Sequence, residues 1–584
     1  MFRSRKIQIA TFLLVIASLV LAGCATPTPE APPVSTEAPP AATEAPAPAA
    51  TEAPAMETEA PAPTEAPAAE RKVATFIWTQ EFDTLNPYYT NMWFSGITQQ
   101  FWSCWAWDFD DQNAPHPVLV QEMPSVENGG ISEDGTTITL KLRDDIVWSD
   151  GEPITSDDFV FTAQMIVDPK NTVAQVNPYD LMTVTAPDAQ TVVMTFEEPY
   201  APWAGIWEGL LPKHILQPVY DAEGTIDNAE WNRAPTVGCG PYNFAEWESG
   251  SFARFTANEN YWLGKPKIDE LFLRFVPDDA SQIAALKAGD GDLGTFFAYP
   301  DVPELEAAGI QIIKSFSGYN EVWYFYLDPE NGHPALQDPN VRKALAMGFD
   351  RFSLNEDLNL GLTVPAVTLW DNTPYANPDL VAYPYDPEAA KALLDAAGWV
   401  DSDGDGVRDK DGVSLELTYG TTTREVRMDT QAVAQQQLAE IGVKVELLNY
   451  DSDIYFSGYG EGGPAATGQL DIFEYSTTSA AFPDPDTADW LCSEIPSDES
   501  PAGVNWSALC DEELDALFKK QTTEVDFAAR QQTFWEICQL MYDKGYIIGI
   551  WQDPDLFGIS GRLQNVKISG ASPFYNIAEW DLTQ

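Results

Sequence analysis

The feature that most restricts how this chain can fold is an abrupt change of composition at Arg71. Residues 25–70 contain almost no large apolar side chain and no Lys or Arg, and the tetrapeptide Thr-Glu-Ala-Pro occurs five times. Such a segment cannot bury enough apolar surface to offset the entropy of ordering its backbone. We therefore expect a disordered Pro/Ala/Thr/Glu-rich tether over 25–70 and a folded body that begins at residue 71.

Residues 1–24 have the layout of an export signal. Basic residues at positions 3, 5 and 6 precede an apolar run that ends in Leu-Ala-Gly-Cys at Cys24. The small residues before the cysteine resemble the lipobox of bacterial lipoproteins, in which this cysteine is acylated. The resemblance implies an extracytoplasmic protein that is lipid-anchored through Cys24, on the periplasmic side or on the outer surface. An ordinary cleaved signal and an uncleaved anchor are the alternatives, although the run is short for a bilayer span of about 20 residues.

The acidity of the chain belongs to the folded body. Once the three basic residues of the signal and the eight acidic residues of the tether are set aside, residues 71–584 carry 28 basic and 82 acidic side chains, a net charge of −54. A surface this negative repels phosphate backbones and anionic lipid, so no nucleic acid is expected as a partner. With three histidines in the whole chain, a His-rich metal centre has little material.

The body alternates between helix and strand patterns. Period-two or continuous apolar runs predict strands, and Asp or Pro starts with Gly stops predict helices. The clearest predicted strands are 73–78, 136–143 and 443–448, and the clearest predicted helices are 281–288, 388–397, 430–441 and 512–520. This alternation over some 500 residues favours an α/β chain with more than one lobe.

A series of motifs resembles family 5 of the bacterial extracellular solute-binding proteins, the oligopeptide- and dipeptide-binding receptors of ABC importers. The matching motifs occur in family order: Asp83–Pro87, Leu140–Phe159, Gly238–Tyr242, Asn258–Trp262, Ala284–Asp292 and Val341–Arg351. Each motif is weak alone, but their order across 73–584 makes the chain similar to this family along essentially the whole body.

The resemblance implies a periplasmic-binding-protein-like fold (type II, cluster C), a two-lobed clamshell with an extra inserted domain. Lobe one would comprise 71–107, 237–318 and 553–584, the inserted domain 108–236, and lobe two 319–552. It also implies a solute captured in a cleft between the lobes and delivered to the subunits of an ABC permease. Glycines 238 and 240 fall where the chain would re-enter lobe one, and tight turns and hinges favour such residues.

Aromatic clusters are the candidates for the ligand-binding wall, with core packing as the alternative for each residue. One cluster lies at 93–107, a second follows one strand at 323–326, and a third lies near 473–484. The candidate ligand-binding residues are Trp93, Phe94, Trp102, Trp323, Tyr324, Tyr326, Tyr475, Phe482 and Asp484.

The third cluster bears on what the ligand is. Peptide-binding members of the family place a carboxylate three residues before an Asp-Pro-type motif, where it pairs with the α-amine of the peptide. Anchored on Asp484–Asp486, that position is Ala481, so the expected counter-charge is missing and Asp484 is the available substitute. An oligosaccharide stacked on aromatic faces is therefore the alternative ligand to an oligopeptide or similar oligomeric solute.

The segment 401–412 is similar to the start of a calcium-binding loop, with carboxylates at positions 1, 3 and 5 and glycine at position 6. Position 12 is Gly412, so the usual bidentate glutamate is absent. We expect a structural calcium ion, with an Asp/Gly-rich turn as the alternative, and no other cofactor. The candidate ligands are Asp401, Asp403, Asp405, Val407, Asp409 and Asp411.

Five cysteines remain after Cys24, and an exported protein meets conditions that permit disulfides. Cys492 and Cys510 flank one short loop and form the favoured pair, and Cys104–Cys239 is a weaker prediction.

Sequence motifs for nucleophilic, zinc-dependent or nucleotide-dependent catalysis are missing, so we expect no enzyme. A glycoside hydrolase with paired carboxylates and an adhesive surface lipoprotein are the remote alternatives.

Overall fold

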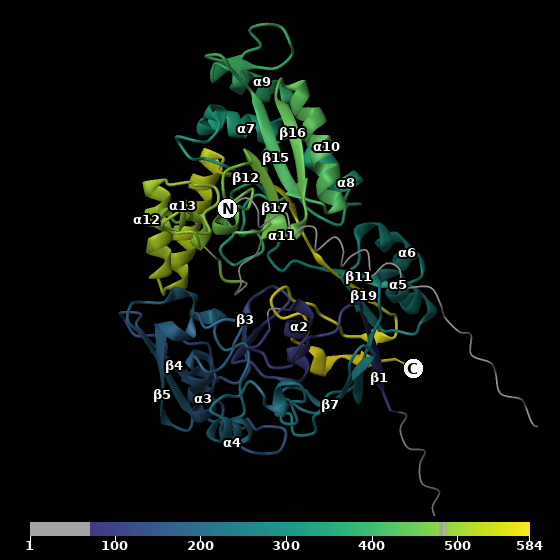
Figure 1. The fold of residues 1–584 in the computed structure, drawn as a ribbon. Helices are drawn as coiled ribbons and strands as arrows, with labels where there is room; N and C mark the ends of the chain where they lie inside the picture. Colours follow the sequence, from purple (N-terminus) through teal and green to yellow (C-terminus); the bar gives the residue numbers. More distant parts are fainter. Residues whose placement is uncertain (1–70, 91, 478–482, 486, 584) are drawn as a thin grey trace, which may run out of the picture. The chain divides into compact units, whose positions relative to one another are not determined.

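The computed structural model describes residues 71–90, 92–477, 483–485 and 487–583 (Figure 1). In these ranges the strands form two large sheets, one of seven strands and one of five. The seven-stranded sheet has the order β11 (Gln311–Ser315), β19 (Asp555–Ile559), β10 (Leu293–Thr295), β1 (Val73–Trp78), β9 (Glu270–Phe275), β8 (Phe252–Ala257) and β7 (Tyr242–Glu248). The five-stranded sheet has the order β16 (Lys444–Tyr450), β15 (Glu416–Thr422), β17 (Ile472–Thr477), β12 (Asn320–Phe325) and β18 (Ile547–Gln552).

Smaller sheets accompany these two. A three-stranded antiparallel sheet runs β4 (Thr137–Lys141), β6 (Thr191–Phe196) and β5 (Met182–Asp188). Two-stranded ribbons are β2 (Trp107–Phe109) with β3 (Pro115–Pro117), β13 (Asp409–Lys410) with β14 (Val413–Ser414), and β20 (Leu563–Gln564) with β21 (Asp581–Leu582). The strand order of these sheets does not test the domain boundaries predicted from the sequence, which stay a prediction.

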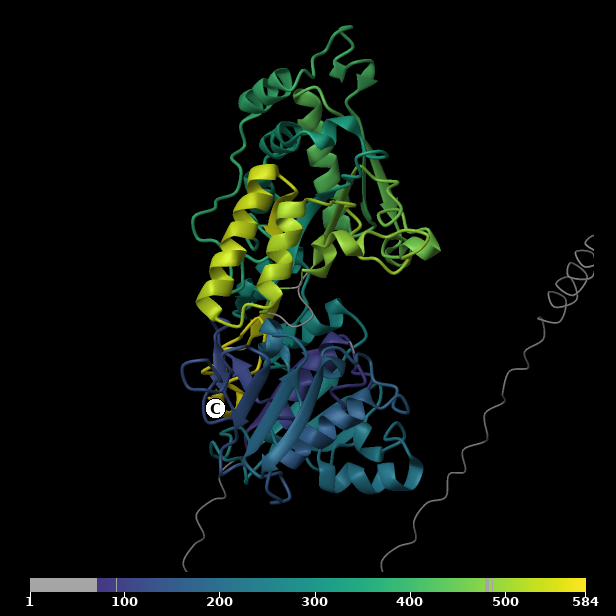
Figure 2. The same ribbon diagram turned by 90° about the vertical axis from the view of Figure 1, so that its left-hand side faces the viewer.

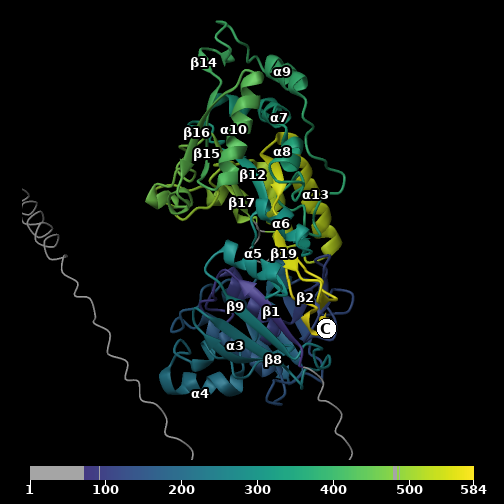
Figure 3. The same cartoon turned by 90° about the vertical axis from the view of Figure 1, so that its right-hand side faces the viewer.

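Helices cover the sheets. They are α2 (Trp93–Trp102), α3 (Ser156–Val167), α4 (Lys213–Glu223), α5 (Asp279–Ala288), α6 (Val302–Ala307), α7 (Pro339–Met347), α8 (Arg351–Asp357), α9 (Pro387–Ala396), α10 (Glu425–Glu440), α11 (Ser452–Tyr455), α12 (Glu512–Thr522) and α13 (Phe527–Lys544). The long yellow helices α12 and α13 lie side by side (Figure 2), and α10 packs along β15 and β16 (Figure 3). None of the helices in the described ranges is long and apolar enough to cross a membrane.

Aspartate caps explain where several helices begin. The side chains of Asp278, Asp386 and Asp526 each accept a hydrogen bond from the backbone N–H three residues later, at 2.7–2.9 Å. These bonds satisfy N–H groups that have no partner inside a helix. The predicted helix start at Asp386 is thus confirmed. The predicted helix 430–441 begins earlier, at Glu425, because its first turn packs inward through the buried Arg427.

Each large sheet has its own hydrophobic core. One buried cluster surrounds the five-stranded sheet, a second surrounds the seven-stranded sheet, and a third fills the region of β4, β5 and β6. Helix α3 contributes to two of them, since Phe161 and Met165 join the core of the seven-stranded sheet whereas Phe159 and Ile166 join the third cluster. The segment that carries α3 is therefore packed onto the seven-stranded sheet over a shared apolar interface.

Glycines 238 and 240 serve close backbone packing. A Cβ atom at Gly238 would lie 2.3 Å from the carbonyl oxygen of Trp102, and one at Gly240 would lie 2.6 Å from that of Ser103. Neither distance is tolerated, so the chain can run this close to the end of α2 only with glycine at both positions. The adjacent Cys239 is joined to Cys104, a link that ties together the two ends of the segment between them.

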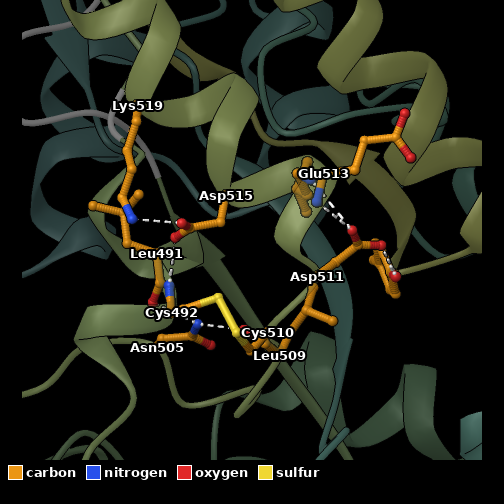
Figure 4. Close-up of a disulfide and its surroundings, with 11 residues drawn as sticks. Leu491, Cys492, Asn505, Leu509, Cys510, Asp511, Glu513, Asp515 and Lys519 are labelled. Carbon is orange, nitrogen blue, oxygen red and sulfur yellow. Dashed lines mark hydrogen bonds and ion pairs between the residues drawn. A yellow bond between two sulfur atoms is a disulfide. The ribbon is translucent and has the colours of Figure 1, made fainter.

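The second disulfide joins Cys492 to Cys510 beside the start of α12 (Figure 4). The backbone N–H of Cys492 donates to Asp515 at 2.9 Å, and Asp515 also forms an ion pair with Lys519 at 2.5 Å. Asn505 lies inside the closed loop and its amide donates to the carbonyl of Leu509 at 2.9 Å. The loop is therefore held both by the covalent link and by hydrogen bonds to its backbone. Among the described cysteines, Cys538 is the free one, and it is buried.

We expect the two disulfides to differ in their effect on stability. The pairs are 135 and 18 residues apart, and a longer closed loop removes more entropy from the unfolded chain. Replacing Cys104 and Cys239 by Ala should lower the free energy of unfolding by about 5 kcal/mol, against about 3 kcal/mol for the Cys492 and Cys510 pair. Urea denaturation of the two double variants measures this difference. A larger loss from the shorter loop would contradict the chain-entropy explanation.

Candidate ligand-binding site

A cavity of about 500 Å³ opens between α2 and several loops. Helix α2 presents Trp93, Gly96, Ile97 and Gln100 to it, a spacing that puts these residues on one face of a helix. Gln99 of α2 also lines it, and the remaining wall comes from residues far apart in the sequence: Pro87, Tyr88, Thr90, Met92, Trp105, Ala174, Gln175, Asn177, Pro178, Tyr179, Gly205, Glu208, Ser317, Tyr319, Gly570, Ala571 and Pro573. A volume of this size lies within the range of about 300–1,000 Å³ found for small-molecule sites.

The wall of this cavity is aromatic and amide-rich. Two tryptophans and three tyrosines line it, together with three glutamines and one asparagine. Glu208 is the one charged side chain among the described residues that line it. Aromatic faces and a few polar groups at fixed positions are the usual composition of a site that binds an organic solute.

Two tyrosines opposite α2 form a linked pair. The hydroxyl groups of Tyr88 and Tyr179 lie 3.1 Å apart, and that of Tyr88 donates to the carbonyl of Gly209 at 2.8 Å. Burial raises the pKa of both tyrosines, and the negative charge of Glu208 raises them further. Both hydroxyls therefore stay protonated at physiological pH and can act as hydrogen-bond donors.

The aromatic residues predicted around α2 divide between wall and core. Trp93 lines the cavity, where its ring also lies 5.9 Å from that of Phe296. Phe94 and Trp102 are buried in the core of the seven-stranded sheet. Adjacent residues of a helix point in different directions, so Trp93 can face the cavity while its neighbour Phe94 packs into the core.

The aromatic residues predicted on β12 and β17 lie in the core of the five-stranded sheet or at its edge. Trp323 is buried, stacks on Phe349 at 4.9 Å and donates from its indole N–H to the hydroxyl of Tyr419 at 2.7 Å. Tyr324 is buried and stacks on Tyr475 at 4.4 Å. The four residues Trp323, Tyr324, Tyr326 and Tyr475 line neither of the two cavities of this section. Phe482 lies outside the described residues.

A second, more apolar cavity of about 230 Å³ contains Asp484 on its wall. Both carboxylate oxygens of Asp484 accept hydrogen bonds from Arg530, at 2.6 and 2.8 Å, and both side chains are buried. Arg530 also donates to Gln521 and to the hydroxyl of Tyr375. Although burial lowers it, the pKa of Arg530 is raised above its usual value by the Asp484 carboxylate. Asp484 therefore already has a cationic partner within the protein.

The loop predicted to bind calcium brings three of its carboxylates together. Asp401, Asp403 and Asp405 can each offer one oxygen, and these atoms lie within 4.8 Å of one another. Each of the three side chains also accepts a hydrogen bond from a backbone N–H two or three residues later, at 2.7–3.1 Å. These bonds hold the loop in a tight coil on the surface.

The other predicted calcium ligands have different surroundings. Asp409 accepts hydrogen bonds from the backbone N–H and the hydroxyl group of Ser402. Asp411 lies in the two-residue turn between β13 and β14, where its φ of 53° and the φ of 80° at Gly412 are those of a tight hairpin turn. The oxygen cluster therefore includes neither residue. Calcium binding by this loop, including the part of Val407, stays a prediction.

An aromatic cavity of this size, beside a fold with two large sheets, fits a protein that binds an organic solute. The family "Bacterial extracellular solute-binding proteins, family 5 Middle" matches residues 115–495, and the chain belongs to this family. The oligopeptide-binding protein AppA of Bacillus subtilis is 26% identical over 467 residues, which are 78% of this chain and 82% of that protein. The recognition made from the ordered motifs is confirmed, and the homologues are substrate-binding proteins of ABC transporters, not enzymes.

Solved structures share the fold. AppA of Bacillus subtilis in complex with a nonapeptide has a TM-score of 0.63 at 22% identity, covering 88% of this chain and 100% of that chain. NikZ of Campylobacter jejuni in complex with Ni(L-His) has a TM-score of 0.67 at 23% identity, with the same coverage. These similarities confirm the predicted α/β, two-lobed periplasmic-binding-protein fold class.

Sequence reasoning missed several residues of the cavity, including Tyr88, Tyr179, Glu208 and Tyr319. They carry no motif and lie in loops or, for Tyr179, at the start of a short 3-10 helix, and their separation along the chain conceals that they meet. Trp105 stood inside the first aromatic cluster, so composition could have placed it in the set of candidates.

The pair of Asp484 and Arg530 should matter for stability. Asp484→Asn leaves the buried Arg530 charge without its counter-ion, and such a loss costs about 3–5 kcal/mol. We expect urea denaturation to show a fall of this size in the free energy of unfolding. The double variant Asp484→Asn, Arg530→Met removes both charges and should recover part of the loss. If the single variant were as stable as the original protein, the pair would have no such role.

Proposed function

We propose that this protein captures a short peptide, or a similar oligomeric solute, in the cavity beside α2 and delivers it to the permease of an ABC importer. The observation that carries the proposal is the origin of the cavity wall. Its residues include members of α2, of the segments 174–179 and 205–208, and the pair Ser317 and Tyr319. The last two lie in a connection between the two large sheets, so the wall includes the part of the chain that a hinge motion would rearrange.

Hinge closure supplies a mechanism without covalent chemistry. A ligand shifts the protein toward the conformation with which it makes more contacts, and a permease can distinguish that conformation. Closure also removes water from the solute, which strengthens its hydrogen bonds to the wall. The peptide class is supported by the name of the homologue AppA, an oligopeptide-binding protein.

An oligosaccharide is the second candidate ligand. The cavity combines two tryptophans with the side-chain amides of Gln99, Gln100, Gln175 and Asn177. Aromatic faces stack on sugar rings, and amides can both donate to and accept from sugar hydroxyls. This composition, rather than any similarity in sequence, favours a sugar.

The ligand class can be tested by retention. The purified protein is mixed with a casein digest and, separately, with a mixture of cello- and malto-oligosaccharides, then washed and analysed by mass spectrometry. We expect peptides to be retained and tryptophan fluorescence to change on binding. Trp93→Leu should weaken binding about ten-fold, because a desolvated aromatic contact is lost. Trp535→Leu, which changes a half-buried tryptophan on α13, is the matched control.

Three outcomes distinguish the candidates. Retention of sugars alone would favour the second candidate. Retention of neither class, with unchanged fluorescence, would contradict the proposal. An equal loss of affinity in the Trp93 and Trp535 variants would place the ligand elsewhere.

We also propose that the protein is a lipoprotein anchored through Cys24, with residues 25–70 as its tether. Support comes from the residues that precede Cys24 and from the composition of 25–70. A single acyl chain binds membranes weakly, so stable anchoring requires more than one chain.

The anchor makes a simple prediction about fractionation. Expressed in a bacterial host with radiolabelled palmitate, the full chain should incorporate label and sediment with membranes. Cys24→Ser should abolish labelling and release the protein, whereas Cys538→Ser, which changes a buried cysteine, should not. Label in the Cys24→Ser variant would contradict acylation at this position.

A further inference from the structure

Glu208 is a carboxylate without a counter-charge on the wall of the 500 Å³ cavity. Among the described residues, none donates a hydrogen bond to it or forms an ion pair with it. The residues of the folded body that lie outside the described ranges include no Lys or Arg in the sequence. No protein cation is therefore available to neutralise this group. Burying a charge without a partner is unfavourable, so an isolated carboxylate at a binding wall calls for an explanation.

The backbone on the N-terminal side of Glu208 is held in an unusual conformation. Trp207 has a φ of 71°, a value that a bulky residue rarely adopts. Its backbone N–H donates to the hydroxyl of Tyr179 at 3.2 Å, and its carbonyl accepts from Ala106 at 3.1 Å. The buried indole of Trp207 packs against Phe159, with ring centroids 5.0 Å apart. Backbone strain of this kind persists where surrounding contacts over-determine it, and it is concentrated at functional positions.

The backbone on the C-terminal side is held as firmly. A Cβ atom at Gly209 would lie 2.8 Å from the ring of Pro87, and the carbonyl of Gly209 accepts from Tyr88. Glu208 thus stands between two anchored residues, which positions its side chain in advance of binding. A charged group that is already held in position lowers the entropy cost of binding a ligand.

The surroundings of Glu208 suit a cation. Tyr88 and Tyr179 lie close enough that its charge raises their pKa, although burial is the larger cause. Trp93 and Trp105 line the same cavity, and the faces of aromatic rings attract organic cations. The folded body as a whole is strongly acidic, which favours the approach of cationic solutes.

We propose that Glu208 is the counter-charge for an ammonium group of the transported solute, and that the aromatic wall around it encloses that group. This inference rests on the proposed function, since it assigns a chemistry to the same cavity. For a peptide, the group would be the terminal amine or a lysine side chain. For a sugar, it would be an amino group. Ala481, where the family pattern would put a carboxylate, lies outside the described residues, and Glu208 is a carboxylate from a different part of the chain.

The proposal makes binding depend on pH. Burial raises the pKa of Glu208 to about 7. A proton on Glu208 competes with an ammonium group, so affinity should be full well above pH 7 and should fall as the pH drops through 7. The titratable groups that share the cavity wall are Tyr88, Tyr179 and Tyr319, all with raised pKa values, so none of them changes charge in this range.

The test compares n-butylammonium with its neutral counterpart n-butanol by isothermal titration calorimetry on the full chain. At pH 8 we expect saturable binding of n-butylammonium, at least ten-fold tighter than that of n-butanol. Glu208→Gln should remove this preference, and Glu208→Asp should keep part of it. Glu197→Gln, which changes an exposed carboxylate in the same region, should leave it unchanged. At pH 5.5 the preference of the unaltered protein should fall at least ten-fold, a measurement that requires no variant.

Failure of this inference is distinguishable from failure of the proposed function. If the casein digest is retained but n-butylammonium shows no preference, or if the preference survives in Glu208→Gln, Glu208 is not the ammonium site and peptide capture stands. If no peptide is retained while the preference depends on Glu208, the cation site stands and the peptide class falls. If n-butylammonium and n-butanol bind equally at both pH values, the inference is overturned.

Discussion

The architecture depends on two short connections between the two large sheets. In one, β11 ends at Ser315 and β12 begins at Asn320; in the other, β18 ends at Gln552 and β19 begins at Asp555. The strands that flank these connections pair with each other, β12 with β18 in the five-stranded sheet and β11 with β19 in the seven-stranded sheet. We call the two connections together the crossing. Each sheet also has its own buried core, so these connections are natural places for bending. Ser317 and Tyr319 of the first connection belong to the cavity wall, which couples the site to the crossing.

The crossing itself contains partly buried acidic groups. The backbone N–H of Asp553 donates to the carbonyl of Tyr319 at 2.8 Å, and Arg424 forms an ion pair with the Asp553 carboxylate at 3.1 Å. Asp555 accepts from the hydroxyl of Ser317 at 2.5 Å, and burial raises its pKa to about 7. These contacts join the two connections through hydrogen bonds and an ion pair. The strength of such interactions depends on their surroundings. Such bonds can be remade as a hinge moves, whereas an apolar core cannot be separated so easily.

Two buried arginines in this protein are paired with carboxylates, in contrast to Glu208. Arg427 forms a two-point ion pair with Glu321, at 2.8 and 3.0 Å, and Arg530 does the same with Asp484. In both pairs the two charges neutralise each other, so neither needs a ligand as its counter-charge. The carboxylate at the cavity wall has no such partner among the described residues, so its charge is available to a solute. The same physical cost of burying charge therefore explains both the paired groups and the unpaired one.

Sequence alone determined the class of the protein and many of its local elements. Ordered motifs identified the family, the caps and apolar periodicity placed β1 over 73–78 and the start of α9 at Asp386, and composition separated the tether from the body. These features depend on neighbours in the chain, which a sequence displays directly. The part each aromatic residue plays was decided only by tertiary structure. β12 lies between β17 and β18 with both faces covered, so Trp323 and Tyr324 became core, whereas Trp93 reached the cavity from one face of α2. Glu208 meets α2 and Tyr319 only after folding, because a binding site depends on distances in space, and separation along the chain does not specify those distances.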